Sequence, residues 1–191
     1  MEYGMEFMKH RVCPWWMGYF LLSSLRKIYH NPEKILTNYI HQGMTVLDIG
    51  SGMGFFSIPM ARMAGPQGKV ICLDLQQKML DKLVKRAKKF NVEQIIQARL
   101  TKENSLGIDD LKGTIGFALS FAVAHEVKDR AHYFAQIYTA MKQRSNLLLA
   151  EPCLRVSQEE FQEIVHNAEQ GGFNNSESLS IPKVNAVLLT K

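Results

Sequence analysis

The fold of this chain is decided by the stretch Met44-Thr-Val-Leu-Asp-Ile-Gly-Ser-Gly-Met-Gly-Phe-Phe-Ser57. Its apolar run 46–49 is broken by glycines at positions 50, 52 and 54, and apolar residues then recur with helical spacing. This order is typical of a buried strand, a tight glycine turn and a helix. Glycines let a ligand lie against the main chain, and the free N–H groups at the helix start face the same point. We therefore expect a nucleotide-binding turn.

The spacing of the glycines argues against a dinucleotide ligand. A dinucleotide fingerprint has glycines at its first, third and sixth positions, whereas here the third glycine, Gly54, is at the fifth position and Phe55 at the sixth. The strand also carries Asp48 just before the first glycine, where its carboxylate would repel a pyrophosphate but can hold a cationic amino group. The pattern favours a ligand with a positive end over one with phosphates.

In its acidic-x-Gly-x-Gly-x-Gly form, this loop resembles that of the class I S-adenosylmethionine-dependent methyltransferases, and a second strand, 70–74, ends in an acid at about the expected distance. The resemblance covers roughly residues 43–191. It implies a methyltransferase of the small-molecule type, with S-adenosyl-L-methionine as cofactor and S-adenosyl-L-homocysteine as product. It also implies an α/β fold, Rossmann-like and doubly wound, with a seven-stranded, mainly parallel sheet and helices on both faces.

The pattern along the chain leads to the same fold class. Helices and strands alternate from residue 43 onward, which specifies a parallel sheet covered on both faces. Two strands in direct succession at the end require that one of them runs antiparallel, as the family's last strand does. Strands are expected at 45–49, 69–73, 95–100, 115–121, 146–150, 176–181 and 185–190, and helices at 54–64, 77–90, 108–111, 129–142 and 157–170.

Residues 1–42 form a separate, aromatic-rich extension before the domain at 43–191. We expect a short helix after Pro14 and a second one over 32–41. One interpretation is a helical cover packed on the sheet; the other is a lid over cofactor and acceptor. Two adjacent tryptophans cannot both face inward on one helix, so acceptor contacts are expected from Trp15, Trp16 and Tyr19.

The cofactor site is expected beyond the carboxyl ends of the parallel strands. The resemblance implies that Asp74 binds both ribose hydroxyls and that Leu75 and Met79 flank the adenine. The third strand lacks the acid that many relatives use for the adenine, so the backbone of Arg99 or Leu100 is expected to substitute. The expected cofactor-binding residues are Asp48, Gly50, Ser51, Gly52, Gly54, Phe55, Asp74, Leu75, Met79, Leu100 and Phe121.

The acceptor side is expected after the fourth and fifth strands. His125 and Glu126 are adjacent ionisable residues there, and they are the candidate catalytic pair. The alternative for His125 is that it orients the following helix. Glu151 either faces the acceptor or anchors its loop. The fourth strand lacks the signature of base- or glutamine-directed enzymes and the aspartate of magnesium-dependent catechol-type enzymes, so no metal is expected.

Composition narrows the partners and the location. Three widely spaced cysteines, without a C-x-x-C pair, indicate reducing cytoplasm, and the apolar stretch 12–22 is too short to cross a membrane. The net charge of +5 is concentrated near helix 78–89, which is interpreted as a solvated face. The expected acceptor is an O, S, N or C atom of a small molecule. The alternatives are an RNA or protein methyltransferase that docks through helix 78–89, or a non-catalytic cofactor-binding module.

Overall fold

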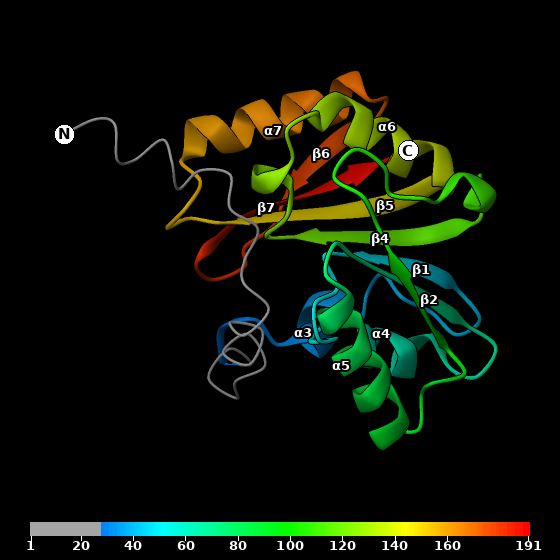
Figure 1. Cartoon of the computed structure of the whole chain (residues 1–191). Coiled ribbons are helices and arrows are strands. Elements are labelled where there is room, and N and C mark those ends of the chain that lie inside the picture. Colours follow the sequence, from blue (N-terminus) through cyan, green and yellow to red (C-terminus); the bar gives the residue numbers. More distant parts are fainter. Residues whose placement is uncertain (1–27) are drawn as a thin grey trace.

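A seven-stranded sheet forms the centre of the molecule (Figure 1), in a computed structural model that describes residues 28–191. The strand order is β3-β2-β1-β4-β5-β7-β6. Strand β7 runs antiparallel to both of its neighbours, and all other neighbouring strands pair in parallel. This topology confirms the fold class expected from the sequence, including the antiparallel last strand. The strands are β1 (Thr45–Ile49), β2 (Lys69–Asp74), β3 (Ile96–Leu100), β4 (Ile115–Phe121), β5 (Met141–Pro152), β6 (Asn174–Ser178) and β7 (Val184–Thr190).

Helices cover both faces of the sheet. Figure 1 shows α6 (Arg130–Ala140) and α7 (Gln158–Gln170) on one face and α3 (Pro32–Leu36), α4 (Ser57–Ala64) and α5 (Gln77–Lys89) on the other. Two buried clusters correspond to these two layers, one containing α6 and α7 side chains and one containing α3, α4 and α5 side chains. Two short 3-10 helices, η3 (Asp109–Leu111) and η4 (Ala124–Glu126), lie in the loops on either side of β4.

Local sequence explains where the helices begin and which side they bury. Helix α7 begins after Ser157, whose hydroxyl accepts a hydrogen bond from the N–H of Glu160 at 3.1 Å. Helix α5 is amphipathic, because its apolar residues recur every three or four positions and point at the sheet. The buried ones are Met79, Leu80, Leu83 and Ala87.

Three elements differ clearly from the sequence-based expectation. The helix expected over 32–41 ends at Leu36, whose carbonyl accepts the N–H groups of Tyr39 and Ile40 in a tight turn. Strand β5 begins at 141 and not at 146, because Met141 already pairs with Ile115 of β4. The next pair is Phe117 with Asn146, and the extra residues of β5 between these two pairs form a bulge. The expected strand 176–181 is found at Asn174–Ser178.

The helix expected after Pro14 and most of the proposed extension lie outside the described residues. Within residues 28–191, no helix has both the length and the apolar character needed to cross a membrane.

Candidate active site

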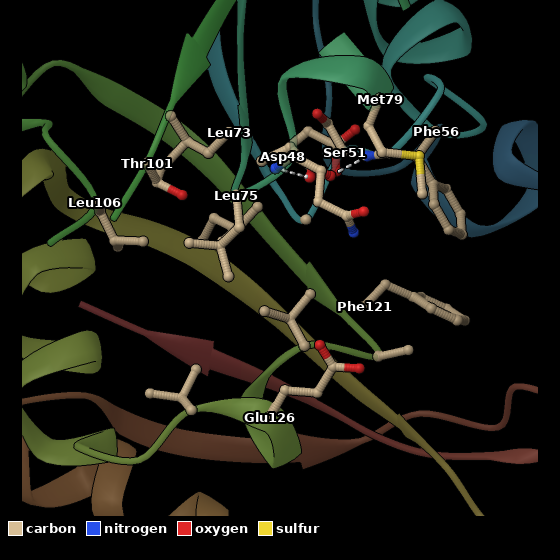
Figure 2. A pocket seen from close by; sticks show the side chains of 18 of the residues that line it. Asp48, Ser51, Phe56, Leu73, Leu75, Met79, Thr101, Leu106, Phe121 and Glu126 are labelled. Carbon is tan, nitrogen blue, oxygen red and sulfur yellow. Dashed lines mark hydrogen bonds between the residues drawn. The ribbon is translucent and has the colours of Figure 1, made fainter. Parts of the chain in front are cut away.

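A cavity opens beyond the carboxyl ends of β1, β2 and β4, at the edge where the strand order reverses. Figure 2 shows Asp48, Ser51 and Met79 on one wall, and Phe121 and Glu126 on the opposite wall. The lining residues come from five segments: 48–53 with 55 and 56, 73–76 with Met79, 101–103 with Leu106, 121–123 with 126 and 127, and Tyr133.

The glycine loop between β1 and α4 packs tightly against the end of β4. Gly50 has φ +69, and a Cβ added there would lie 2.4 Å from Cγ2 of Val123. Gly52 has φ +52, and the nearest atom to an added Cβ is 4.0 Å away. Behind the loop, the guanidinium of Arg86 donates to the carbonyl of Met53, and burial lowers the pKa of Arg86. The loop is therefore held in shape from two sides.

Asp74 joins the glycine loop to the end of β2. Its Oδ2 accepts the N–H of Gly52 and its Oδ1 accepts the N–H of Gln76, both at 2.8 Å. Burial raises the pKa of Asp74, and the backbone hydrogen bonds from Gln76, Gly52 and Leu75 offset part of this rise. A carboxylate has about four lone-pair positions, so Asp74 can still accept a hydrogen bond from a ligand hydroxyl.

Two polar groups of the first loop complete this wall. Asp48 is 2% exposed, and its Oδ2 accepts the Ser57 hydroxyl at 2.5 Å, which ties β1 to the start of α4. The Ser51 hydroxyl is buried and makes no hydrogen bond within the described part of the chain. Since buried polar atoms are nearly always paired, Ser51 is a candidate ligand contact.

The opposite wall is formed by the turn after β4. Ala122 adopts φ +61, a left-handed conformation that is uncommon for residues other than glycine. Its N–H donates to the carbonyl of Ala150 at 2.7 Å, and Glu151 accepts the next two N–H groups, those of Val123 at 3.2 Å and Ala124 at 2.7 Å. These bonds from β5 hold a strained turn at the site, as is frequent near functional residues.

His125 lies behind this turn and is not among the residues that line the cavity. Its Nδ1 is 2.5 Å from Oε2 of Glu151, and its Nε2 is 3.9 Å from Oε1 of Glu126. Glu151 is fully buried beneath η4, while Glu126 lines the cavity. Among the acceptor-side residues expected from the sequence, the structure thus brings Glu126 to the cavity and places His125 and Glu151 behind it.

Most residues expected to bind the cofactor line the cavity. Gly54 and Leu100 do not: an added Cβ at Gly54 would contact Leu83 of α5, and Leu100 is 54% exposed. Trp15, Trp16 and Tyr19 lie outside the described residues. The residues found at the cavity are Asp48, Gly50, Ser51, Gly52, Phe55, Asp74, Leu75, Met79 and Phe121.

Sequence reasoning missed several lining residues. Thr101 directly follows β3, and its N–H donates to the carbonyl of Asp74 at 2.9 Å, so the rule of strand ends would have found it. Tyr133 reaches the cavity from α6, and its hydroxyl is 2.8 Å from that of Ser120. Burial raises the pKa of Tyr133, so its phenol stays neutral at pH 7. No pattern of strand ends indicates a helix residue of this kind.

The first described residues reach the edge of the site. The ring of His30 packs edge-on against Phe121, with centroids 5.1 Å apart, and its Nε2 is 2.8 Å from the carbonyl of Pro182. Phe121 in turn packs against Phe56, with centroids 4.8 Å apart. His30 therefore lies beside Phe121, at the edge of the site.

The sequence matches a family described as a methyltransferase domain over residues 40–182. It is 30% identical over 105 residues to protein-L-isoaspartate O-methyltransferase 2 of Arabidopsis thaliana, covering 53% of this chain and 32% of that protein. It is 33% identical over 106 residues to demethylmenaquinone methyltransferase of Lactobacillus johnsonii, covering 54% of this chain and 41% of that protein. The chain spans less than half the length of either relative.

The fold is shared with a solved structure of a SAM dependent methyltransferase from Aquifex aeolicus. The TM-score is 0.83 at 21% sequence identity, and the match covers 93% of this chain and 98% of that chain. At this identity the match establishes the fold alone.

Proposed function

This chain belongs to the methyltransferase-domain family, and on that basis we propose that it transfers a methyl group from S-adenosylmethionine to an O, S, N or C atom of a small molecule. The observation that carries the proposal is Asp74, a nearly buried carboxylate in the cavity wall that is fixed by backbone N–H groups and keeps capacity to accept a ligand hydroxyl.

The cofactor of this family is S-adenosylmethionine, and the residues at the cavity fit it. Asp74 would bind the ribose hydroxyls, the unpaired Ser51 hydroxyl and the glycine loop would face the methionine part, and Leu75 and Met79 would flank the adenine. When bound, the cofactor supplies a methyl group on a positively charged sulfur, which is already activated for transfer. The chain's own residues then have to bind the cofactor and the acceptor, orient them toward each other and exclude water.

The acceptor is proposed to lie between the cofactor and the turn after β4. Apolar side chains surround this region, including Leu106, Val123 and Val127, and Glu126 adds one carboxylate. A compact acceptor suits such a wall, and one relative is named for demethylmenaquinone. We further propose that residues 1–42 cover the site, with Trp15, Trp16 and Tyr19 as acceptor contacts, since His30 already packs on Phe121. The cytoplasmic location stays a prediction.

A macromolecular acceptor is the second candidate. Helix α5 exposes Lys78, Lys85, Lys88 and Lys89 along its outer side, and another relative is named for a protein substrate. Docking of RNA through these lysines would show as binding that weakens steeply with salt. A non-catalytic cofactor-binding module would bind the cofactor without transferring its methyl group to any acceptor.

Calorimetric titration with S-adenosylmethionine, S-adenosylhomocysteine and NAD tests the proposal. We expect both adenosyl compounds to bind and NAD not to bind, because the glycine loop lacks the dinucleotide spacing. Asp74→Ala should weaken binding of both compounds by about tenfold or more, since hydrogen bonds to a charged group contribute roughly 1.5–3 kcal/mol. Binding of NAD alone, or unchanged affinity in Asp74→Ala, contradicts the assignment of the site.

A further inference from the structure

One buried nitrogen has no hydrogen bond that would account for its position. Nε2 of His125 is shielded from solvent and makes no hydrogen bond within the described residues, although the imidazole is only 9% exposed. An unpaired buried polar atom is costly and uncommon, and such atoms often have a chemical role. The atom that faces it at ion-pair distance is Oε1 of Glu126, 3.9 Å away.

The other side of the imidazole is firmly held. Nδ1 lies 2.5 Å from Oε2 of Glu151, a carboxylate that also accepts two backbone N–H groups through its other oxygen. An ionised carboxylate only accepts hydrogen bonds, so this contact places the imidazole proton on Nδ1. The lone pair of a neutral imidazole then lies on Nε2, toward Glu126.

Other charged groups near this histidine come from α6 and α7. Arg130 of α6 donates to the carbonyl of Ala124 at 3.2 Å and pairs with Glu160 of α7 at 3.1 Å, so its charge is balanced by a carboxylate other than Glu126 or Glu151. The phenol of Tyr133, also on α6, is hydrogen-bonded to Ser120. His125 thus lies between two carboxylates: Glu151, buried in β5, and Glu126, which lines the cavity.

We propose that Glu126 is the catalytic base of this methyltransferase, and that His125, fixed by Glu151, is a positioning residue that receives the proton from Glu126. The inference rests on the proposed function. It explains the unpaired Nε2: this nitrogen has a partner once Glu126 carries a proton and moves about 1 Å closer to form a hydrogen bond of ordinary length.

In the proposed reaction, the acceptor loses a proton and gains a methyl group. The acceptor atom gives its proton to the Glu126 carboxylate, and its electron pair forms the bond to the methyl carbon. The bond between that carbon and the positively charged sulfur breaks, and its electrons stay on the sulfur, which becomes neutral. The proton then lies between Glu126 and Nε2 of His125, while Nδ1 of His125 keeps its contact with Glu151.

This arrangement selects a class of acceptor. A carboxylate that lines the cavity repels an anionic acceptor. It can act as a base only on an acceptor that carries a removable proton, so the reacting group is a hydroxyl, a thiol or a protonated amine. An acceptor that reacts as a carboxylate, or a tertiary amine without a proton, does not need Glu126. The structure thus narrows the small-molecule acceptor to one that loses a proton on methylation.

The first test is the ¹⁵N spectrum of the full chain labelled at its histidine nitrogens, with the His125 signals identified by their loss in His125→Gln. We expect Nδ1 to carry the proton. Glu126→Gln should move the Nε2 signal and leave Nδ1 nearly in place, because only Nε2 faces Glu126. Glu169→Gln is the matched control, since Glu169 pairs with His166 at 3.8 Å on the exposed side of α7 and should leave both His125 signals unchanged.

The second test is transfer of a labelled methyl group to phenol, benzyl mercaptan, benzoate and N,N-dimethylaniline. We expect phenol or benzyl mercaptan, which keep their protons at neutral pH, to be methylated in preference to the other two. Glu126→Gln should lower kcat by about 10²–10⁴-fold, the usual contribution of a general base, and Glu126→Asp should recover part of it. The cofactor affinity measured by calorimetry should change by less than about twofold in Glu126→Gln, because Glu126 is assigned to the acceptor.

The outcomes separate this inference from the function on which it rests. The inference is wrong and the proposed function stands if the adenosyl compounds bind but the Nε2 signal of His125 does not change in Glu126→Gln. The same holds if they bind and benzoate is the preferred acceptor. If Glu126→Gln weakens S-adenosylmethionine far more than S-adenosylhomocysteine, Glu126 faces the sulfur's charge and is not the base. If neither compound binds, the proposed function itself fails.

Discussion

At the scale of single residues, the environment of Asp74 predicts how the site responds to acid. Burial raises the pKa of this carboxyl above its ordinary value of 3.8. The ionised form is the one that accepts two backbone N–H groups and, in our proposal, the ribose hydroxyls. A group with a raised folded-state pKa adds stability below its unfolded pKa, and this stability is lost as pH rises through the folded-state pKa. The folded protein is therefore less stable with Asp74 ionised, the form used for binding, than with Asp74 protonated.

Cofactor affinity should accordingly be constant near neutral pH and decline on acidification, beginning at a higher pH than for an exposed aspartate. Calorimetric titrations of S-adenosylhomocysteine between about pH 7 and pH 4.5 measure this. Asp74→Asn, which cannot ionise, serves as control. It should bind S-adenosylhomocysteine weakly, with an affinity that depends little on pH in this range. A wild-type affinity that stays constant down to about pH 4.5 would contradict the expectation.

The two central glycines of the loop should differ in how much they tolerate a side chain. Gly52→Ala meets open space and has only the left-handed backbone to adopt, at about 1–2 kcal/mol. Gly50→Ala has the same backbone problem and also overlaps Val123, so we expect about 2–5 kcal/mol. Urea unfolding of both variants measures the difference in the free energy of unfolding. Equal losses of unfolding free energy in the two variants would show that the turn after β4, which carries Val123, can move away from position 50 at little cost.

Individual site residues were most predictable where their chemistry is tied to a strand end. Asp74 is the last residue of β2 and Asp48 the last but one of β1, so a sequence pattern is enough to place both at the cavity. The neighbours His125 and Glu126 were not separable in this way, because the 3-10 turn of η4 points one side chain back toward Glu151 and the other into the cavity. Such directions depend on contacts distant in sequence.

At the scale of elements, α5 shows why its bounds were predictable to within one residue. Apolar residues at helical spacing face the sheet and lysines face away, so pattern and packing agree. Strand β5 shows the opposite case, because residues 141–145 look like a polar turn and yet belong to the strand through a bulge. Arg144 there has φ +60, a conformation that no local residue preference indicates.

The two sides of α5 should respond differently to truncation. Leu83 is fully buried against the sheet and beside Gly54, whereas its neighbour Val84 is 38% exposed. We expect Leu83→Ala to lower the free energy of unfolding by about 2–5 kcal/mol and Val84→Ala to change it by about 0.5 kcal/mol or less. Chemical denaturation provides both values. Comparable losses would mean that α5 is not packed as described.

At the scale of the whole molecule, stability should be graded from the centre of the sheet to its edges. Strands β1 and β4 are almost wholly buried and have a strand on each side, while β3 is an edge strand of partly exposed residues. We therefore expect amides of β3 to exchange with solvent at least about tenfold faster than those of β1 and β4. Hydrogen exchange followed by mass spectrometry or NMR measures this gradient, and equal protection of β3 and β1 would contradict it.

The position of β7 has a consequence for how the protein is made. Strand β7 lies between β5 and β6 in the sheet although it follows both in the chain. A ribosome delivers β5 and β6 first, so one edge of β5 waits unpaired until residues 184–190 emerge, and an unpaired edge invites pairing with other chains. The strands that carry the glycine loop and Asp74 are synthesised before that moment. The nascent chain therefore builds its cofactor cradle early and closes its sheet last, and this final interval is when it most needs a chaperone.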